Sequence, residues 1–262
     1  MSHRIGACWL MGAALAFGVP AGIQAQGRGG PAGPPATARA AAPIDLTGYW
    51  VSQIVDEWRF RVTPQKGDIP YMPINAAARR VALAWDPAKD EAEGNQCKAY
   101  GAVGVMQRPG RLHISWEDDN TLKIEADAGT QTRRLRFGPA PAPTPAPTGE
   151  PSWQGYSVAS WQMPGGGRRG AAPPPGPRSG TLKVVTTNLR PGYIRKNGVP
   201  YSGNTVLTEY LSQLIGQEGD SYLVVTAMVE DPLYLTQPFV RSYQFKKLPD
   251  AQGWDPTPCF PR

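Results

Sequence analysis

Short segments in which apolar and polar residues alternate follow one another through most of the chain. In the segment 111–116, for example, Leu112, Ile114 and Trp116 alternate with polar residues. A period of two places successive side chains on opposite faces of a β-strand. The chain also contains 30 glycines and 29 prolines among 262 residues, and these two residue types disfavour helices. The pattern therefore predicts an all-β protein and excludes a coiled coil.

Turn residues separate about ten such segments. The expected strands are 46–54, 58–63, 111–116, 121–126, 131–137, 153–163, 181–189, 205–215, 222–229 and 239–248. One short helix is expected from Pro73 to Ala84, because its apolar residues recur at helical spacing and Pro73 suits a first turn. Consecutive antiparallel strands favour an up-and-down β-barrel of about eight to ten strands, since closure removes exposed sheet edges. A β-sandwich is the alternative.

The first 25 residues have the pattern of a secretory signal peptide. Arg4 precedes an apolar run from Ile5 to Val19, and Ile23 to Ala25 offer a cleavage site whose last residue, Ala25, is small. The run is shorter than the ~20 residues of a membrane-spanning helix, and glycine and proline interrupt it. We therefore expect residues 1–25 to be removed. The mature protein would be periplasmic or secreted, without membrane insertion.

Low-complexity segments divide the rest of the chain. Residues 26–43 are rich in glycine, proline and alanine, which predicts a disordered tether. Residues 138–151 and 164–180 are rich in proline and glycine, and both fall between predicted strands. We therefore expect a single barrel domain over 44–262 that carries two disordered insertions.

Removal of the signal peptide would leave two cysteines, Cys97 and Cys259. In an oxidising compartment two cysteines most simply form a disulfide, which would tie the C-terminus to the first third of the chain. Two free thiols are the alternative, because the sequence does not give the separation of the Cα atoms.

The formal net charge of the whole chain is +6, but several of the arginines lie in the low-complexity segments. No stripe of lysine and arginine interleaved with aromatic residues occurs in the sequence, so nucleic-acid binding is not expected. The expected partner is a small-molecule ligand, and the protein is expected to be a monomer.

Several segments resemble a known group of proteins. The Gly-x-Trp of Gly48 to Trp50, at the first predicted strand, resembles the start of lipocalin-type barrels. Most of 45–248 is similar to exported bacterial proteins of unknown function with lipocalin-like (calycin-type) character. The other segments that carry this resemblance are Gly155–Ser157 with Trp161, Leu182–Thr187, Arg195–Pro200 and Glu230–Leu235. The resemblance implies a barrel and export, and it implies no activity.

Familiar catalytic signatures are missing from the sequence, including a Gly-x-Ser-x-Gly elbow and a phosphate-binding loop. The mature chain would keep one histidine, so neither a multi-histidine metal site nor a bound cofactor is expected. The candidate acid–base residues are His113, Glu209 and Glu230. His113 could instead be an ordinary outward-facing strand residue. The two glutamates could instead form buried pairs with Arg133 and Arg195.

The richest polar segment of the chain lies between residues 190 and 204. As a loop at the barrel mouth, it would place Arg195 to hold an anion and tyrosines to stack on an apolar ligand. An exposed hairpin connection is the alternative. Tryptophans on predicted strands could line an aromatic cavity or belong to the core. The candidate ligand-binding residues are Tyr193, Arg195, Asn197, Tyr201, Trp58 and Trp116.

The favoured function is binding of a small amphipathic or aromatic ligand inside the barrel. A cofactor-independent lyase, isomerase or hydrolase on the same fold is one alternative, and a structural protein of the cell envelope is another. Convergence of the candidate acid–base residues with Arg195 in a cavity would favour the enzyme. An apolar cavity with a charged rim would favour binding.

Overall fold

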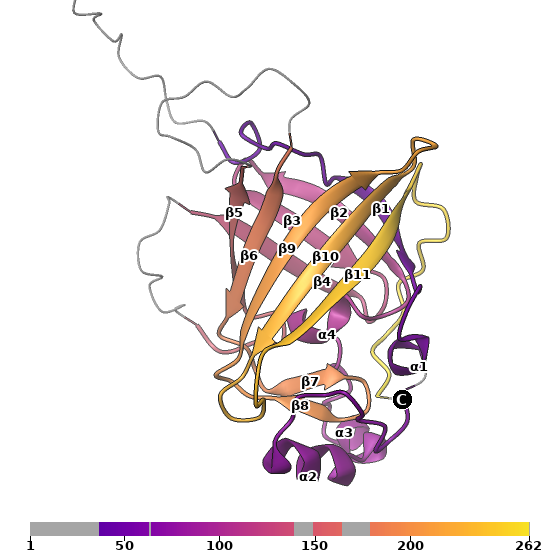
Figure 1. Ribbon diagram of the computed structural model, residues 1–262, viewed down its shortest axis with the longest axis vertical. Helices are drawn as coiled ribbons and strands as arrows, with labels where there is room; N and C mark the ends of the chain where they lie inside the picture. The colour runs from indigo at the N-terminus through magenta and orange to yellow at the C-terminus, as the bar shows by residue number, and fades with distance from the viewer. Residues whose placement is uncertain (1–36, 63, 139–148, 164–178, 262) are drawn as a thin grey trace, which may run out of the picture. The chain divides into compact units, whose positions relative to one another are not determined.

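Nine strands close into a barrel in the computed structural model, which describes residues 37–62, 64–138, 149–163 and 179–261 (Figure 1). The predicted all-β barrel is therefore confirmed. The barrel strands are β1 (Gly48–Gln53), β2 (Arg111–Asp118), β3 (Thr121–Ala126), β4 (Gln131–Phe137), β5 (Tyr156–Gln162), β6 (Thr181–Thr187), β9 (Val206–Ile215), β10 (Ser221–Glu230) and β11 (Phe239–Leu248).

Chain order and spatial order agree around most of the barrel, which gives an up-and-down topology. The strands follow the order β1-β11-β10-β9-β6-β5-β4-β3-β2, and β1 pairs with β2 to close the barrel. Strands β4 and β5 pair in parallel at Leu135–Phe137 and Ser157–Ala159, whereas the other neighbours are antiparallel. An odd number of strands cannot alternate in direction all the way round, so one parallel pair is required.

Four short helices occur among the described residues, where the sequence predicted one. They are α1 (Trp58–Arg61), α2 (Ala76–Ala84), α3 (Pro87–Ala92) and α4 (Ala102–Val105). The predicted helix corresponds to α2, which starts after Asn75 because that side chain accepts a hydrogen bond from Ala78 N. The predicted strand 58–63 is wrong. Glu57 adopts a left-handed conformation, with φ 49°, and the chain then turns into α1.

The helices and a small hairpin close one end of the barrel. The hairpin consists of β7 (Gly192–Arg195) and β8 (Val199–Tyr201). Figure 1 shows α2, α3 and this hairpin together beyond that end, with α4 at the barrel opening. We call α1 to α4 and the β7–β8 hairpin, with their connections, the cap. The predicted disulfide between Cys97 and Cys259 is confirmed, and it ties the C-terminal segment to the cap.

Side chains from the strands fill the middle of the barrel. Trp50, Ile114 and Leu223 are fully buried and belong to one hydrophobic cluster. An ion pair lies within this packed interior, between Arg133 on β4 and Glu209 on β9. Strands β5 and β6 separate β4 from β9 in the sheet, so the pair spans the interior. The hydrophobic core of the barrel therefore encloses this buried ion pair.

The expected signal peptide and much of the expected tether lie outside the described residues, as do the central parts of both insertions. Among the described helices, none has the length and apolar character needed to cross a membrane.

A buried carboxylate fastens the cap to the barrel at the end of β10. Asp231 accepts hydrogen bonds from the Ser202 backbone, from Thr205 Oγ1 at 2.7 Å and from the Leu233 backbone at 2.8 Å. Burial alone would raise the pKa of Asp231, but these hydrogen bonds outweigh it, and the pKa lies below its usual value of 3.8. Ionised Asp231 therefore stabilises the folded state.

Replacing Asp231 with asparagine is expected to lower the free energy of unfolding at pH 7 by about 2 kcal/mol. The asparagine NH2 group would replace one acceptor oxygen and face the N–H and O–H groups that now donate to it. The pKa of Asp231 is lower in the folded than in the unfolded chain. Its stabilisation is therefore complete above about pH 5 and is lost as the pH falls through the folded pKa. Urea titrations of both proteins from pH 7 to pH 3 should show the difference shrinking below about pH 4. A constant difference would contradict this account.

Candidate functional site

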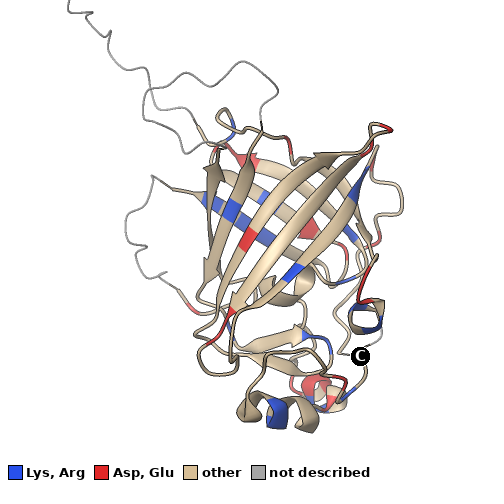
Figure 2. Ribbon diagram, viewed as in Figure 1, with Lys and Arg blue, Asp and Glu red and all other residues tan. Residues whose placement is uncertain are grey.

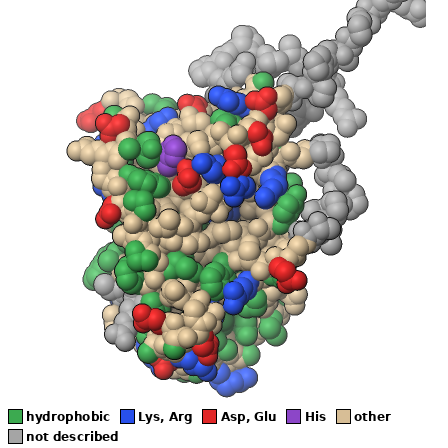
Figure 3. Space-filling model, turned by 180° about the vertical axis from the view of Figure 1, so that it is seen from behind, with side chains coloured by type: hydrophobic (Ala, Val, Ile, Leu, Met, Phe, Trp, Pro, Cys, Tyr) green, Lys and Arg blue, Asp and Glu red, His purple; other side chains and the backbone are tan. Residues whose placement is uncertain are grey.

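His113 lies on the outer face of the barrel rather than in its interior. Its ring stacks on Tyr49 with 4.3 Å between the centroids, and its Nδ1 lies 3.0 Å from Glu125 Oε2. Acidic and basic side chains intermingle on the outer face seen in Figure 3. Lys123 adds a further contact to Glu125 there. His113 thus belongs to a cross-strand network on the surface. It is the outward-facing strand residue that the sequence offered as the alternative to an acid–base role.

The two candidate glutamates lie in different surroundings. Glu209 is 1% exposed and is held by Arg133, with 3.0 Å between Oε1 and Nη1. This is the buried arginine–carboxylate pair that the sequence offered as the alternative to acid–base chemistry. Glu230 lies exposed at the end of β10. Glu209, Glu230 and His113 are therefore not brought together as an acid–base group.

The segment 190–204 is largely buried, because the hairpin β7–β8 packs inside the cap. The Tyr193 hydroxyl donates to Asp90 Oδ2 at 2.8 Å, and Lys98 donates to the other oxygen of that carboxylate. The Asn197 amide donates to the carbonyls of Gln65 and Asp68.

Tyr201, the other candidate of this hairpin, is also buried. Burial, and for Tyr193 also the hydrogen bond to Asp90, raises the pKa of both tyrosines. In this conformation Tyr193 and Asn197 make hydrogen bonds within the cap, whereas the buried Tyr201 hydroxyl has no partner among the described residues.

Trp58 and Trp116 lie at opposite ends of the barrel. Trp58 is 65% exposed on α1. Trp116 is half-buried near the end of β2 away from the cap, and its ring lies 5.6 Å from that of Phe137. They do not share one aromatic cavity.

Buried arginines gather where the cap closes the barrel. Arg61 at the end of α1, Arg108 after α4 and Arg195 at the end of β7 are each 5% exposed or less. Arg241 on β11 lies beside them and is partly exposed. Figure 2 shows basic residues of α1, β7 and β11 near this end. We call these four residues the arginine cluster.

Carboxylates neutralise part of the arginine cluster. Glu57 bridges two of its members, with Oε1 3.4 Å from Arg195 Nη2 and Oε2 2.9 Å from Arg241 Nε. Asp56 lies 3.6 Å from Arg61 and is half exposed. Arg61 also donates through Nε to the Gln107 carbonyl. Glu57 is therefore the central counter-ion of the arginine cluster.

Several guanidinium nitrogens of the arginine cluster have no hydrogen-bond partner among the described residues. They are Arg61 Nη2, Arg108 Nε, Arg108 Nη2 and Arg195 Nη1. Burial lowers the pKa of Arg108 to about 10, and the charges of Arg61 and Arg195 lie close enough to add to this effect. A buried charged donor without an acceptor costs several kcal/mol. These nitrogens are therefore the candidate donors to an anion.

Aromatic rings surround the arginine cluster. The Cζ of Arg195 lies 4.3 Å from the centroid of the Phe60 ring and 5.8 Å from that of Phe239. The Cζ of Arg61 lies 5.3 Å from the ring of Tyr243, and burial raises the pKa of that tyrosine. Charged donors beside aromatic walls suit a ligand with an anionic group and an apolar body.

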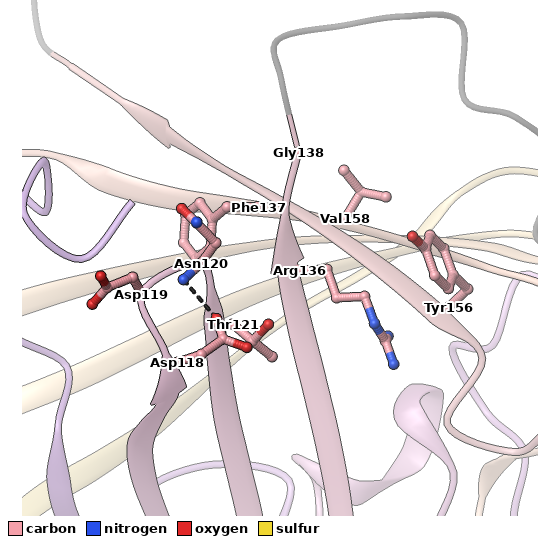
Figure 4. A pocket seen from close by; sticks show the side chains of 9 residues that line it. All are labelled: Asp118, Asp119, Asn120, Thr121, Arg136, Phe137, Gly138, Tyr156 and Val158. Carbon is pink, nitrogen blue, oxygen red and sulfur yellow. Dashed lines mark hydrogen bonds between the residues drawn. The ribbon is translucent and has the colours of Figure 1, made fainter. Parts of the chain in front are cut away.

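A hollow of about 880 Å³ opens at the other end of the barrel (Figure 4). It lies along β4 and β5, where Arg136 stacks on Tyr156 at 5.0 Å. Figure 4 shows the acidic and amide side chains of the β2–β3 turn on one side of β4 and this pair on the other. Asp118 there accepts a hydrogen bond from the Asn120 backbone. This hollow is open, and both acidic and basic side chains line it, so it does not indicate one kind of ligand. We therefore take the arginine cluster as the candidate site.

Sequence reasoning found Arg195 through the density of polar residues around it. It did not find Arg108 or Arg241. No sequence signal separates an arginine that becomes buried from one on the surface. The four arginines come from segments far apart in the chain, so only the fold brings them together.

No family model, no curated protein and no solved structure matches this chain. Within the described part of the chain, no cluster of three or more His, Cys, Asp or Glu side chains could hold a metal ion. The arginine cluster is therefore assessed on its own geometry.

Proposed function

We propose that the protein is an exported, monomeric barrel that binds a small anionic molecule at the arginine cluster. One observation carries this proposal: four buried guanidinium nitrogens lack an acceptor among the described residues. Burying such donors without an acceptor lowers the stability of the folded protein. A bound anion would offset that cost by accepting their hydrogen bonds.

The aromatic walls of the site indicate the rest of the ligand. Phe60, Phe239 and Tyr243 would contact an apolar or aromatic body attached to the anion. This agrees with the amphipathic or aromatic ligand inferred from the sequence, but it moves the site. Because side chains fill the middle of the barrel, we place the ligand at the closed end, under the cap.

Two features support export. The first 25 residues have the pattern of a secretory signal peptide. The disulfide between Cys97 and Cys259 is typical of proteins that fold in an oxidising compartment.

Native mass spectrometry of protein purified from its own cells tests the proposal. The wild-type protein should carry a non-covalent small anion. Arg195→Met should lose it, since removal of a charge-assisted hydrogen bond weakens affinity roughly tenfold to a hundredfold. The fold should survive, because Glu57 keeps its contact with Arg241.

Arg134→Met is the matched control, because Arg134 is a half-exposed arginine paired with Glu117 on the outer face. It should keep the bound molecule. A wild-type protein without any adduct, or one whose adduct survives Arg195→Met, would contradict the proposal.

A further inference from the structure

The geometry points to a phosphoryl group as the anion held by the arginine cluster, either as inorganic phosphate or as a phosphate monoester. This inference rests on the proposed function and names the chemical class of its ligand. Charge balance, donor geometry and the surroundings of the site support it in turn.

The charges of the site call for a dianion. Four guanidinium groups face two carboxylates, those of Glu57 and Asp56. Asp68, the other carboxylate near Arg195, is paired with Arg59. The arginine cluster thus keeps two more positive than negative charges. A phosphate monoester carries about −1.5 to −2 at pH 7, whereas a monocarboxylate carries −1 and would leave a buried guanidinium uncompensated.

The free donors of Arg108 have the arrangement that binds such a group. Its Nε and Nη2 form one edge of the guanidinium plane, and both lack a partner among the described residues. Two parallel N–H groups on one edge hold two oxygens of an oxyanion bidentately. Arg61 Nη2 and Arg195 Nη1 supply further donors. A phosphoryl group offers three terminal oxygens to these nitrogens, and a carboxylate offers two.

The segment that supplies Arg61 to the site also supplies the carboxylate with which a phosphoryl group would compete. Residues 55–62 carry both Arg61 and Glu57, and the backbone amides of Phe60, Arg61 and Val62 donate to carbonyls within this segment. Val55, Trp58 and Val62 on it are exposed. Two side chains hold the segment against the barrel: Glu57 contacts Arg195 and Arg241, and buried Arg61 donates to the carbonyls of Gln107 and Gln53. A phosphoryl group that neutralises the arginines would therefore compete with Glu57 for Arg195 and Arg241.

Isothermal titration calorimetry of the full chain with four probes tests the inference. The probes are inorganic phosphate, phenyl phosphate, benzoate and phenol. Phenyl phosphate should bind roughly tenfold or more tightly than benzoate, because only the dianion balances the site. Phenol, which carries no charge at pH 7, should not bind measurably. Tighter binding of phenyl phosphate than of inorganic phosphate would assign the site to a phosphate ester. Tighter binding of inorganic phosphate would assign it to free phosphate.

Two variants link this affinity to the arginine cluster. Arg108→Lys keeps the charge but loses the two parallel N–H donors, and it should weaken phenyl phosphate binding roughly tenfold. Arg134→Lys on the outer face is its control and should change nothing. Glu57→Gln removes the competing carboxylate and should tighten binding several-fold, roughly threefold to tenfold, with Glu117→Gln as its control. Because Glu57→Gln predicts a gain, it tests the site even if Arg108→Lys fails to fold.

The outcomes separate the two proposals. Benzoate binding as tight as that of phenyl phosphate, with sensitivity to Arg195→Met, would overturn the phosphoryl assignment and leave the anion-binding function standing. Phosphate binding unaffected by Arg108→Lys and Glu57→Gln would also overturn the assignment. Absence of binding by every probe, with no co-purified anion, would overturn the proposed function itself.

Discussion

Replacing Glu209 with leucine is expected to lower the free energy of unfolding by about 3–5 kcal/mol, the cost of leaving a buried charge without its partner. Arg133 is 3% exposed, and Glu209 supplies both of its short charged contacts. Its remaining hydrogen bond, to Thr186 Oγ1, is a longer contact of 3.4 Å with a neutral group. The unpaired guanidinium cannot reach water from the middle of the barrel.

The double variant Arg133→Met/Glu209→Leu should recover most of that loss. Two apolar side chains of similar volume can replace a buried ion pair at little cost, because the desolvation of both charges is no longer required. Urea denaturation of the wild type, both single variants and the double variant measures the coupling. Glu117→Gln, which breaks the half-exposed pair with Arg134, should change stability little. A double variant as unstable as Glu209→Leu would show that the pair does more than balance charge.

The strand pattern of this chain could be predicted because a period of two is a local property. The structure gives 121–126 and 131–137 with the predicted bounds. The pattern failed at 58–63, where the chain forms α1 instead. There the alternation covers too few residues to separate a strand from a helical turn, and the left-handed Glu57 that starts the helix leaves no sequence signal.

The candidate site could be predicted only in part, because burial of an arginine is a tertiary property. The polar segment around Arg195 drew attention to that residue, but the same composition fits an exposed hairpin. Arg108 stands alone beside Pro109 and Gly110 in the sequence, where it looks like an ordinary loop arginine. That its buried Nε and Nη2 lack a hydrogen-bond partner among the described residues becomes visible only in the folded structure.

The Cys97→Ser/Cys259→Ser double variant is expected to lose up to about 5 kcal/mol of unfolding free energy, the loop-entropy value for a crosslink of this span. The two cysteines are 162 residues apart, so the crosslink removes a large share of the freedom of the unfolded chain. Cys97 lies in the cap shortly before α4, and Cys259 lies near the C-terminus. The bond therefore anchors the part of the cap that carries Arg108.

Three measurements on the wild-type protein and this variant check the role of the disulfide. Thiol titration of the unfolded, unreduced wild type should find neither Cys97 nor Cys259 free. Guanidinium denaturation should give the same loss of stability for the variant as for the wild type treated with a reductant, because both lack the same crosslink. If the reduced wild type matched the oxidised protein, the loop-entropy argument would fail. If reduction also weakens phenyl phosphate binding at the arginine cluster, the crosslink preorganises the cap over that site.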